Sequence, residues 1–183
     1  MMKIKYTTIS LFLILFLTSC EKWFWQPDKL HLEKKAYTGS ELRIDGYYYY
    51  EWISDKKEKY IGHLFFYKNG IILEGAYFLS SDSTEIEFNY RNGSWLEQNK
   101  NYMWNWGVFN IDNLAIKYES WSPFDLGDPV YIYEGEILND TTFFISKSYR
   151  LKRGKEKDIT QLERLYHFKQ FSSKPDSTNV FVK

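Results

Sequence analysis

The chain has 183 residues and carries 24 basic and 24 acidic side chains, so its formal net charge is zero. This balance argues against nucleic-acid binding through a broad basic surface, which needs excess Lys and Arg to displace counterions from phosphates. The single cysteine excludes an internal disulfide, so burial of apolar side chains must stabilise the fold. Aromatic residues make up 20% of the sequence and can supply that buried surface.

The first twenty residues have the layout of a secretory signal. Lys3 and Lys5 precede an almost unbroken apolar run over residues 9–17, and small or hydroxylated residues follow it. The run is too short for a membrane-spanning helix, which needs about 20 apolar residues. The pattern therefore predicts that residues 1–19 are a signal peptide.

The sequence Leu17-Thr18-Ser19-Cys20 resembles the lipobox of bacterial lipoproteins. The resemblance implies cleavage before Cys20, a diacylglycerol on its sulfur and a fatty acyl group such as palmitate on its new amino terminus. Three acyl chains would hold the protein on a membrane surface permanently. By the same resemblance, Glu21 after the cysteine favours the outer membrane. An ordinary signal peptide with a chance cysteine is the alternative.

Residues 20–40 are expected to be a lipidated tether. Trp23, Phe24 and Trp25 lie next to the predicted anchor, and Trp rings favour the headgroup interface of a membrane. These rings either lie on the membrane or dock onto the domain itself. Residues 28–36 are either a short helix or a plain linker.

Residues 41–183 are predicted to form a single domain dominated by β-strands. Aromatic and β-branched runs separated by polar turns are typical of strands, and Asn69-Gly70 predicts a hairpin with a type I′ turn. Residues 84–99 alternate like a strand but also have helix-capping spacing, and we expect short helices there. Residues 151–158 are expected to be a basic loop. The strands are expected at residues 42–52, 60–68, 71–79, 104–111, 114–121, 130–138, 141–150 and 160–171, with a possible edge strand at 180–182.

About eight antiparallel strands joined by hairpins predict an all-β meander that closes as a barrel or a strongly curled sheet, with a β-sandwich as the alternative. The barrel resembles lipocalin-like (calycin) proteins. Ile44-Asp45-Gly46-Tyr47-Tyr48 is similar to their first-strand Gly-x-Trp motif, with Tyr48 in the place of the tryptophan.

Four tryptophans gather around the helical insert and the two strands that follow it. Aromatic rings beside polar groups form pockets for small ligands, and flat rings also stack on sugars. Cross-strand pairing and core filling are the alternative. The candidate ligand-binding residues are Trp95, Trp104, Trp106 and Trp121.

The sequence contains no motif of hydrolases, nucleotide-binding loops or zinc proteases. His31, His63 and His167 have no metal-ligand spacing. Carboxylates such as Glu51 and Glu74 are spread along the strands, and only the fold can bring two of them together. We therefore expect no enzymatic activity, no metal and no cofactor.

Three Asp-Ser/Thr-Thr segments resemble the acceptor of a periplasmic O-glycosylation system. The candidate acceptors are Ser83, Thr141 and Ser177, and chance turn sequences are the alternative.

These observations predict a cell-envelope protein anchored to membrane lipid through Cys20 that binds a small or saccharide ligand. The alternative is a structural or assembly component that docks onto another envelope protein. A large lined cavity would favour ligand binding, whereas an exposed apolar patch without a cavity would favour docking.

Overall fold

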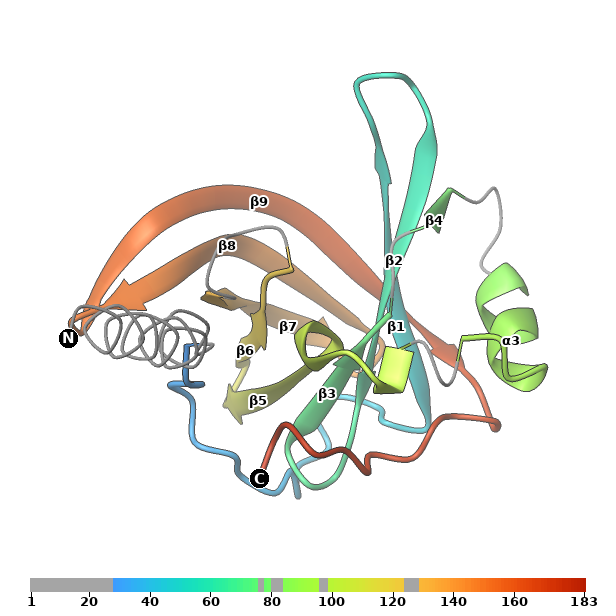
Figure 1. Cartoon of the computed structure of the whole chain (residues 1–183), viewed down its shortest axis with the longest axis horizontal. Helices are drawn as coiled ribbons and strands as arrows, with labels where there is room; N and C mark the ends of the chain where they lie inside the picture. Colours follow the sequence, from blue (N-terminus) through green and yellow to red (C-terminus); the bar gives the residue numbers. More distant parts are fainter. Residues whose placement is uncertain (1–27, 76–77, 80–83, 96–98, 124–128) are drawn as a thin grey trace, which may run out of the picture.

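The computed structural model describes residues 28–75, 78–79, 84–95, 99–123 and 129–183. The chain forms a closed eight-stranded antiparallel barrel with one short helix, which confirms the predicted barrel over the sandwich (Figure 1). The elements are β1 (Gly46–Ile53), β2 (Lys59–Phe66), β3 (Ile71–Glu74), β4 (Phe78–Leu79), α3 (Thr84–Arg91), the 3-10 turn η1 (Met103–Asn105), β5 (Trp106–Asp112), β6 (Ala115–Trp121), β7 (Val130–Asn139), β8 (Thr142–Lys152) and β9 (Lys155–Gln170).

Neighbours in sequence are neighbours in the barrel. The order around it is β1-β9-β8-β7-β6-β5-β3-β2, and the pairing of β1 with β2 closes the ring. The short β4 pairs with the start of β2, beyond the residues that pair with β3. Because every connection links adjacent strands, the barrel is an up-and-down meander.

The hairpin predicted at Asn69-Gly70 is confirmed, but its predicted turn type is wrong. Only Gly70 has a positive φ, of 81°, whereas a type I′ turn needs two such residues. The Gly70 N–H donates to the Tyr67 carbonyl and the Tyr67 N–H donates to the Ile71 carbonyl, both at 3.0 Å. The loop therefore comprises residues 68–70 and is one residue longer than predicted. It ends on Gly70, whose φ lies in the left-handed region.

The loop predicted at residues 151–158 is wrong. Strands β8 and β9 continue through this region, and only Arg153 and Gly154 form the turn, with φ angles of 54° and 72°. This two-residue turn matches the right-handed twist of the strands. Both faces of this hairpin end lie in solvent, so its sequence has no apolar alternation to mark a strand. The possible edge strand at residues 180–182 does not form.

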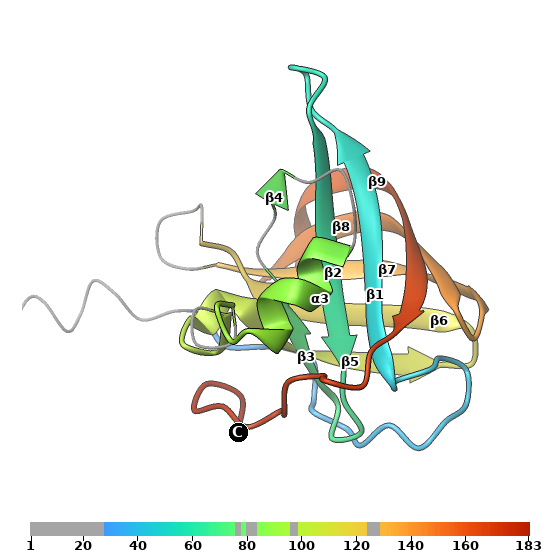
Figure 2. The same ribbon diagram turned by 90° about the vertical axis from the view of Figure 1, so that its right-hand side faces the viewer.

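The helical insert is confirmed at α3. Ile86 and Tyr90 are one helical turn apart and are both buried, whereas Phe88 lies on the exposed face. Figure 2 shows α3 lying across the outside of the barrel beside β2. The Tyr90 ring packs edge-on against Phe65 of β2, with ring centres 5.1 Å apart.

Both faces of part of the sheet are buried. One apolar cluster has members from all eight barrel strands, including Tyr48, Phe66, Phe109, Phe143 and Tyr166, and therefore fills the interior. A second cluster lies on the outer face, where α3, the carboxyl-terminal segment and the amino-terminal segment cover β1, β2, β3, β5 and β6. The run of four tyrosines in β1 accordingly alternates between the two clusters.

Residues 28–40 are predicted to belong to the tether, but they lie against the barrel and contain no helix. Trp121 Nε1 donates to the Asp28 carbonyl at 2.7 Å. The backbone N–H groups of His31 and Leu32 both donate to the Glu119 carboxylate, at 2.7–2.9 Å. Glu119 is completely buried, and these donors offset the cost of burying its charge. This part of the chain therefore belongs to the folded body.

The same segment then closes one end of the barrel. Tyr37, Leu42 and Ile44 pack into the interior cluster, and the Arg43 N–H donates to the Asp140 carbonyl at 2.9 Å. Tyr48 also donates its hydroxyl hydrogen to the Asp140 carbonyl, at 2.7 Å. The barrel therefore has one closed end and one open mouth.

Candidate ligand-binding site

A cavity of about 920 Å³ lies at the open mouth of the barrel. Its existence follows from the divergence of two strands. β1 and β9 pair only over four residues each, Gly46 to Tyr49 against His167 to Gln170. Beyond them β1 rises with β2 as a projecting hairpin while β9 arcs away over β8, as Figure 1 shows. Tyr50 and Trp52 on one strand and Leu162 and Arg164 on the other line the space between them.

The deep part of the cavity carries opposite charges. Glu74 at the end of β3 and Arg164 of β9 both line it. Ser120 donates its hydroxyl hydrogen to Glu74 Oε2 at 3.3 Å. The Arg164 guanidinium lies over the rings of Tyr50 and Tyr133, at 5.0 and 5.7 Å from their centres. Cation–π contacts of this kind attract the guanidinium to the ring faces.

Buried tyrosine hydroxyls lie next to this charged floor. The hydroxyl groups of Tyr118 and Tyr166 are 3.0 Å apart, and the Tyr118 ring stacks on Tyr133 at 4.6 Å. Burial raises the pKa of all three phenols, and the negative charge of Glu74 raises the pKa of each further. These phenols therefore stay protonated near neutral pH.

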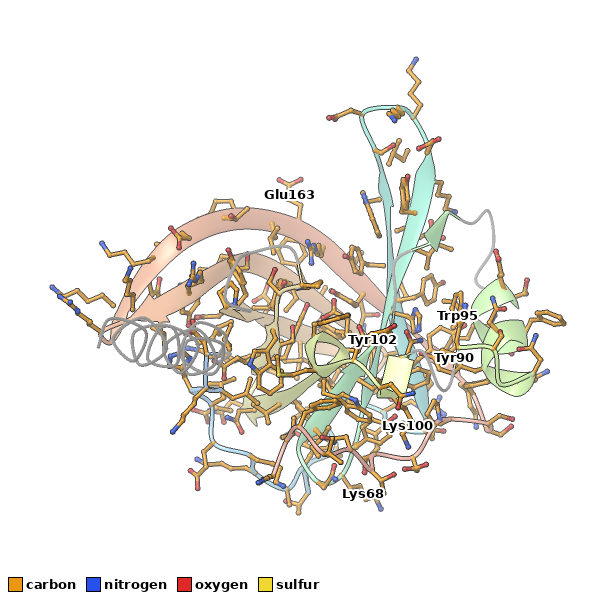
Figure 3. All side chains as sticks on the ribbon, in the orientation of Figure 1. Lys68, Tyr90, Trp95, Lys100, Tyr102 and Glu163 are labelled. Atoms are coloured by element: carbon orange, nitrogen blue, oxygen red, sulfur yellow. The ribbon has the colours of Figure 1, made fainter. Side chains whose placement is uncertain are left out.

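Stacked rings form the upper walls. Trp52 stacks on Tyr50 at 5.3 Å and on Tyr60 at 5.1 Å, so three rings follow one another along the β1–β2 hairpin. On the other side Tyr102 stacks on Trp104 at 4.7 Å, with an angle of 14° between the planes. Tyr102 is 46% exposed and lies at the mouth, whereas Glu163 on β9 points away from the barrel (Figure 3). The walls thus offer flat apolar faces that are accessible from solvent.

The candidate tryptophans divide into two pairs. Trp104 and Trp121 line the cavity and also pack in the outer-face cluster. Trp106 is completely buried on the outer face, and its Nε1 donates to the Lys100 carbonyl at 2.9 Å. Trp95 packs outside the barrel, where its ring stacks on His63 at 5.8 Å near Tyr90 of α3 (Figure 3). Ligand binding by these residues stays a prediction.

Sequence reasoning did not single out the polar residues of the cavity. In the sequence Glu51 and Glu74 are only two of the carboxylates spread along the strands, whereas in the structure both line the same cavity together with Arg164 and Gln161. Glu51 lies at the rim in an ion pair with Lys59 at 2.9 Å. The alternation of β9 does place Arg164 on the same face as Leu162 and Tyr166, and this is the one signal that could have found it.

The three histidines lie in three different environments. His63 is buried, its Nε2 lies 3.0 Å from the Tyr90 hydroxyl, and burial lowers its pKa to about 3. His31 Nδ1 lies 2.7 Å from Glu119 Oε1, and His167 is exposed beside the Tyr49 ring. Among the described residues, no three His, Cys, Asp or Glu side chains come close enough together to hold a metal ion.

Other predicted sites lie away from the cavity or outside the described part of the chain. Cys20, Trp23, Phe24, Trp25 and Ser83 fall outside the described residues. Thr141 lies in the β7–β8 turn, where its hydroxyl donates to Asn139 Oδ1 at 2.8 Å. Ser177 lies in the carboxyl-terminal segment and accepts a hydrogen bond from Asn69. Glycosylation of any of the three candidates stays a prediction.

No protein-family model matches this chain, and no curated protein or solved structure is significantly similar to it. Among the residues that the structure describes, no helix has the length and apolar character needed to cross a membrane.

Proposed function

We propose that this chain is a lipid-anchored protein of the cell envelope, held at the outer membrane through acylated Cys20, and that its barrel mouth binds a small or saccharide ligand without catalysis. The observation that carries the binding proposal is the cavity of about 920 Å³. Its size falls within the range of pockets that enclose small molecules, roughly 300–1,000 Å³. Aromatic walls and a few convergent polar groups are the usual lining of such pockets.

The lining supports a neutral, hydroxyl-rich ligand over an anionic one. Arg164 is the only basic side chain of the cavity lining within the described residues, and Glu74 lines the same deep part of the cavity. Glu51 is paired with Lys59 at the rim, and Glu163 points away from the barrel. Glu74 offsets the charge of Arg164, so this part of the cavity offers an anionic ligand no net attraction, whereas sugar hydroxyls can donate to the Glu74 carboxylate. The stacked pair of Tyr102 and Trp104 supplies the flat apolar surface on which a sugar ring packs.

Docking onto another envelope protein remains the second candidate. The large apolar side chains that are exposed among the described residues lie on different elements, such as Ile53 on the β1–β2 hairpin, Phe88 on α3 and Leu114 in the β5–β6 turn. Such scattered exposure is ordinary for a folded domain, and it favours the cavity over a docking patch.

The proposal is tested by replacing Tyr102 with alanine. Tyr102 lines the cavity but is 46% exposed, so Tyr102→Ala removes a stacking surface at little cost in stability. The matched control is Phe88→Ala, an exposed aromatic residue on α3 that does not line this cavity. Native mass spectrometry of the protein released from its own envelope measures co-purified small molecules, and titration calorimetry with neutral oligosaccharides measures affinity.

We expect a small-molecule adduct on the native protein and on Phe88→Ala. Loss of one aromatic stacking contact should weaken binding of that molecule by Tyr102→Ala by about tenfold, equivalent to roughly 1.4 kcal/mol. Equal binding by all three proteins would place the ligand elsewhere. A stoichiometric protein adduct with an empty cavity would instead support the docking candidate.

A further inference from the structure

The far end of the β8–β9 hairpin carries a cluster of cations. Lys152, Arg153, Lys155 and Lys157 are all exposed, and we call these four residues the basic tip. Acidic residues are present in the same hairpin, but they pair elsewhere. Glu156 binds Lys147 at 3.2 Å and Asp158 binds Arg150 at 3.5 Å. Within the described residues, none of the four side chains of the basic tip has an acidic partner.

The arrangement of the basic tip lowers the stability of the β8–β9 hairpin. Lys152 lies directly opposite Lys155. Arg150, which lies opposite Lys157, has Asp28 and Asp158 as acidic partners, so the uncompensated pair is the one next to the turn. Like charges in directly opposed cross-strand positions destabilise a sheet. Folding alone therefore does not account for this pattern, and a bound anionic surface would turn the repulsion into attraction. The two-residue turn at Arg153 and Gly154 presents the charges at the end of a projecting hairpin, visible at the left of Figure 1.

The path of the chain places the predicted anchor near the base of this hairpin. Asp28 accepts a hydrogen bond from Trp121 at 2.7 Å, and its carboxylate lies 3.7 Å from Arg150 of β8. Cys20 precedes Asp28 by eight residues, and eight residues span at most about 28 Å when fully extended. An acylated Cys20 would therefore keep the base of the β8–β9 hairpin within about 28 Å of the membrane.

We propose that the basic tip binds anionic lipid headgroups of the membrane that carries the anchor. This proposal rests on the lipid anchor of the proposed function and adds a second point of attachment. Each Lys or Arg that lies near the membrane increases the preference for an anionic surface over a neutral surface by about fivefold. Two attachment points restrict rotation of the barrel, which a single flexible anchor does not.

The second attachment also determines how the mouth of the cavity is oriented relative to the membrane. Gln161 of the cavity lining lies on β9 only four residues beyond Lys157, about 13 Å along the strand. Binding of the basic tip would therefore hold the β9 side of the mouth close to the headgroups. The closed end of the barrel, near Leu114 of the β5–β6 turn, would point away from the membrane.

The test uses the full-length lipidated protein in vesicles of phosphatidylcholine, with or without phosphatidylglycerol. Cys20 is the only cysteine, and in the proposed anchor its sulfur carries the diacylglycerol, so Arg153→Cys introduces a single site for a fluorescent label. This reporter keeps the three lysines of the basic tip. Leu114→Cys provides the control label, on an exposed residue at the closed end. Spin-labelled headgroups in the vesicles quench the label wherever it lies at the membrane surface.

We expect strong quenching at position 153 in anionic vesicles, weak quenching there in neutral vesicles, and weak quenching at position 114 in both. Combining Lys152→Gln, Lys155→Gln and Lys157→Gln should lower the bound-to-free ratio of the tip by about 100-fold and abolish the response to phosphatidylglycerol. The matched control replaces Lys34, Lys35 and Lys68, three exposed lysines outside the β8–β9 hairpin, and should leave the response unchanged.

The outcomes distinguish a failure of the basic-tip proposal from a failure of the proposed lipid anchor. If the protein floats with vesicles of both compositions but position 153 is never quenched more than position 114, the basic tip does not bind lipid and the anchor stands. Equal quenching at position 153 in neutral and anionic vesicles would also overturn the proposal. If the protein fails to float with any vesicle, the anchor itself is wrong.

Discussion

Replacing Glu119 with alanine should release the amino-terminal segment from the barrel. Glu119 is completely buried on the outer face of β6, and its carboxylate accepts the backbone N–H groups of His31 and Leu32. The His31 ring makes a third contact, with Nδ1 at 2.7 Å from Oε1. Without the carboxylate, two backbone donors would have to stay buried without a partner or return to water.

The magnitude follows from these contacts. A hydrogen bond to a charged group contributes about 1.5–3 kcal/mol net, so two of them set an upper limit of about 6 kcal/mol. If the amino-terminal segment detaches, water can bind both N–H groups. The loss of stability then cannot exceed the free energy with which this segment docks onto the barrel. We therefore expect Glu119→Ala to lower the free energy of unfolding by about 3 kcal/mol. Glu119→Gln retains one carbonyl acceptor and should cost about half as much.

Two assays check this prediction on the detergent-solubilised protein. Urea denaturation followed by tryptophan fluorescence gives the free energy of unfolding. Limited trypsin digestion reports on Lys29, Lys34 and Lys35, which lie in the docked segment and are exposed. In Glu119→Ala these sites should be cut at concentrations of protease that leave the barrel intact.

The matched control is Glu136→Gln, which changes an exposed carboxylate on β7 and should shift stability by less than about 0.5 kcal/mol. If Glu119→Ala lowers stability while the lysines stay protected, Glu119 serves only core packing. If neither stability nor cleavage changes, the reasoning from buried hydrogen bonds is refuted.

Two further predictions concern pH. Burial lowers the pKa of His63 to about 3. Between pH 6.5 and 3 the folded state therefore binds fewer protons than the unfolded state, and the free energy of unfolding falls as the pH drops through this range. Relative to His63→Phe, the wild-type protein should lose roughly 3 kcal/mol between pH 6.5 and 4 in urea titrations, and parallel curves would contradict the assignment. Burial lowers the pKa of Lys174 to about 8, and its ammonium donates to the carbonyls of Ile44 and Phe66. Because the unfolded chain binds this proton up to about pH 10.5, wild-type stability should rise between pH 8 and 10 relative to Lys174→Met, and an identical pH profile of the two proteins would show that Lys174 titrates normally.

Local alternation predicted most strands correctly because each strand has at least one buried face. The tyrosine run of β1 and the mixed face of β9 were placed in strands from their residue types alone. The β8–β9 hairpin end was missed because it extends beyond the core, where charged residues occupy both faces. The turn at Asn69-Gly70 was misjudged in type because Asn tolerates a positive φ without adopting one here.

The cavity depended on information that no local pattern contains. Trp104 and Trp106 are two residues apart and both pack in the outer-face cluster, yet only Trp104, which lies in η1, also lines the cavity. Residue type and spacing alone do not show which of the two rings reaches the cavity. Glu74 and Arg164 are 90 positions apart, and they meet at one cavity only because closure of the barrel brings β3 and β9 to the same mouth.

By itself, the sequence determined that this chain is an antiparallel meander with a helical insert, because strand and turn preferences act over a few residues. Only the tertiary structure decided where the sheet closes, which aromatic rings face the cavity and that residues 28–40 are part of the body. These features arise from contacts between residues far apart in the chain, such as Glu119 with His31. Their free energy depends on burial that exists only once the barrel has formed.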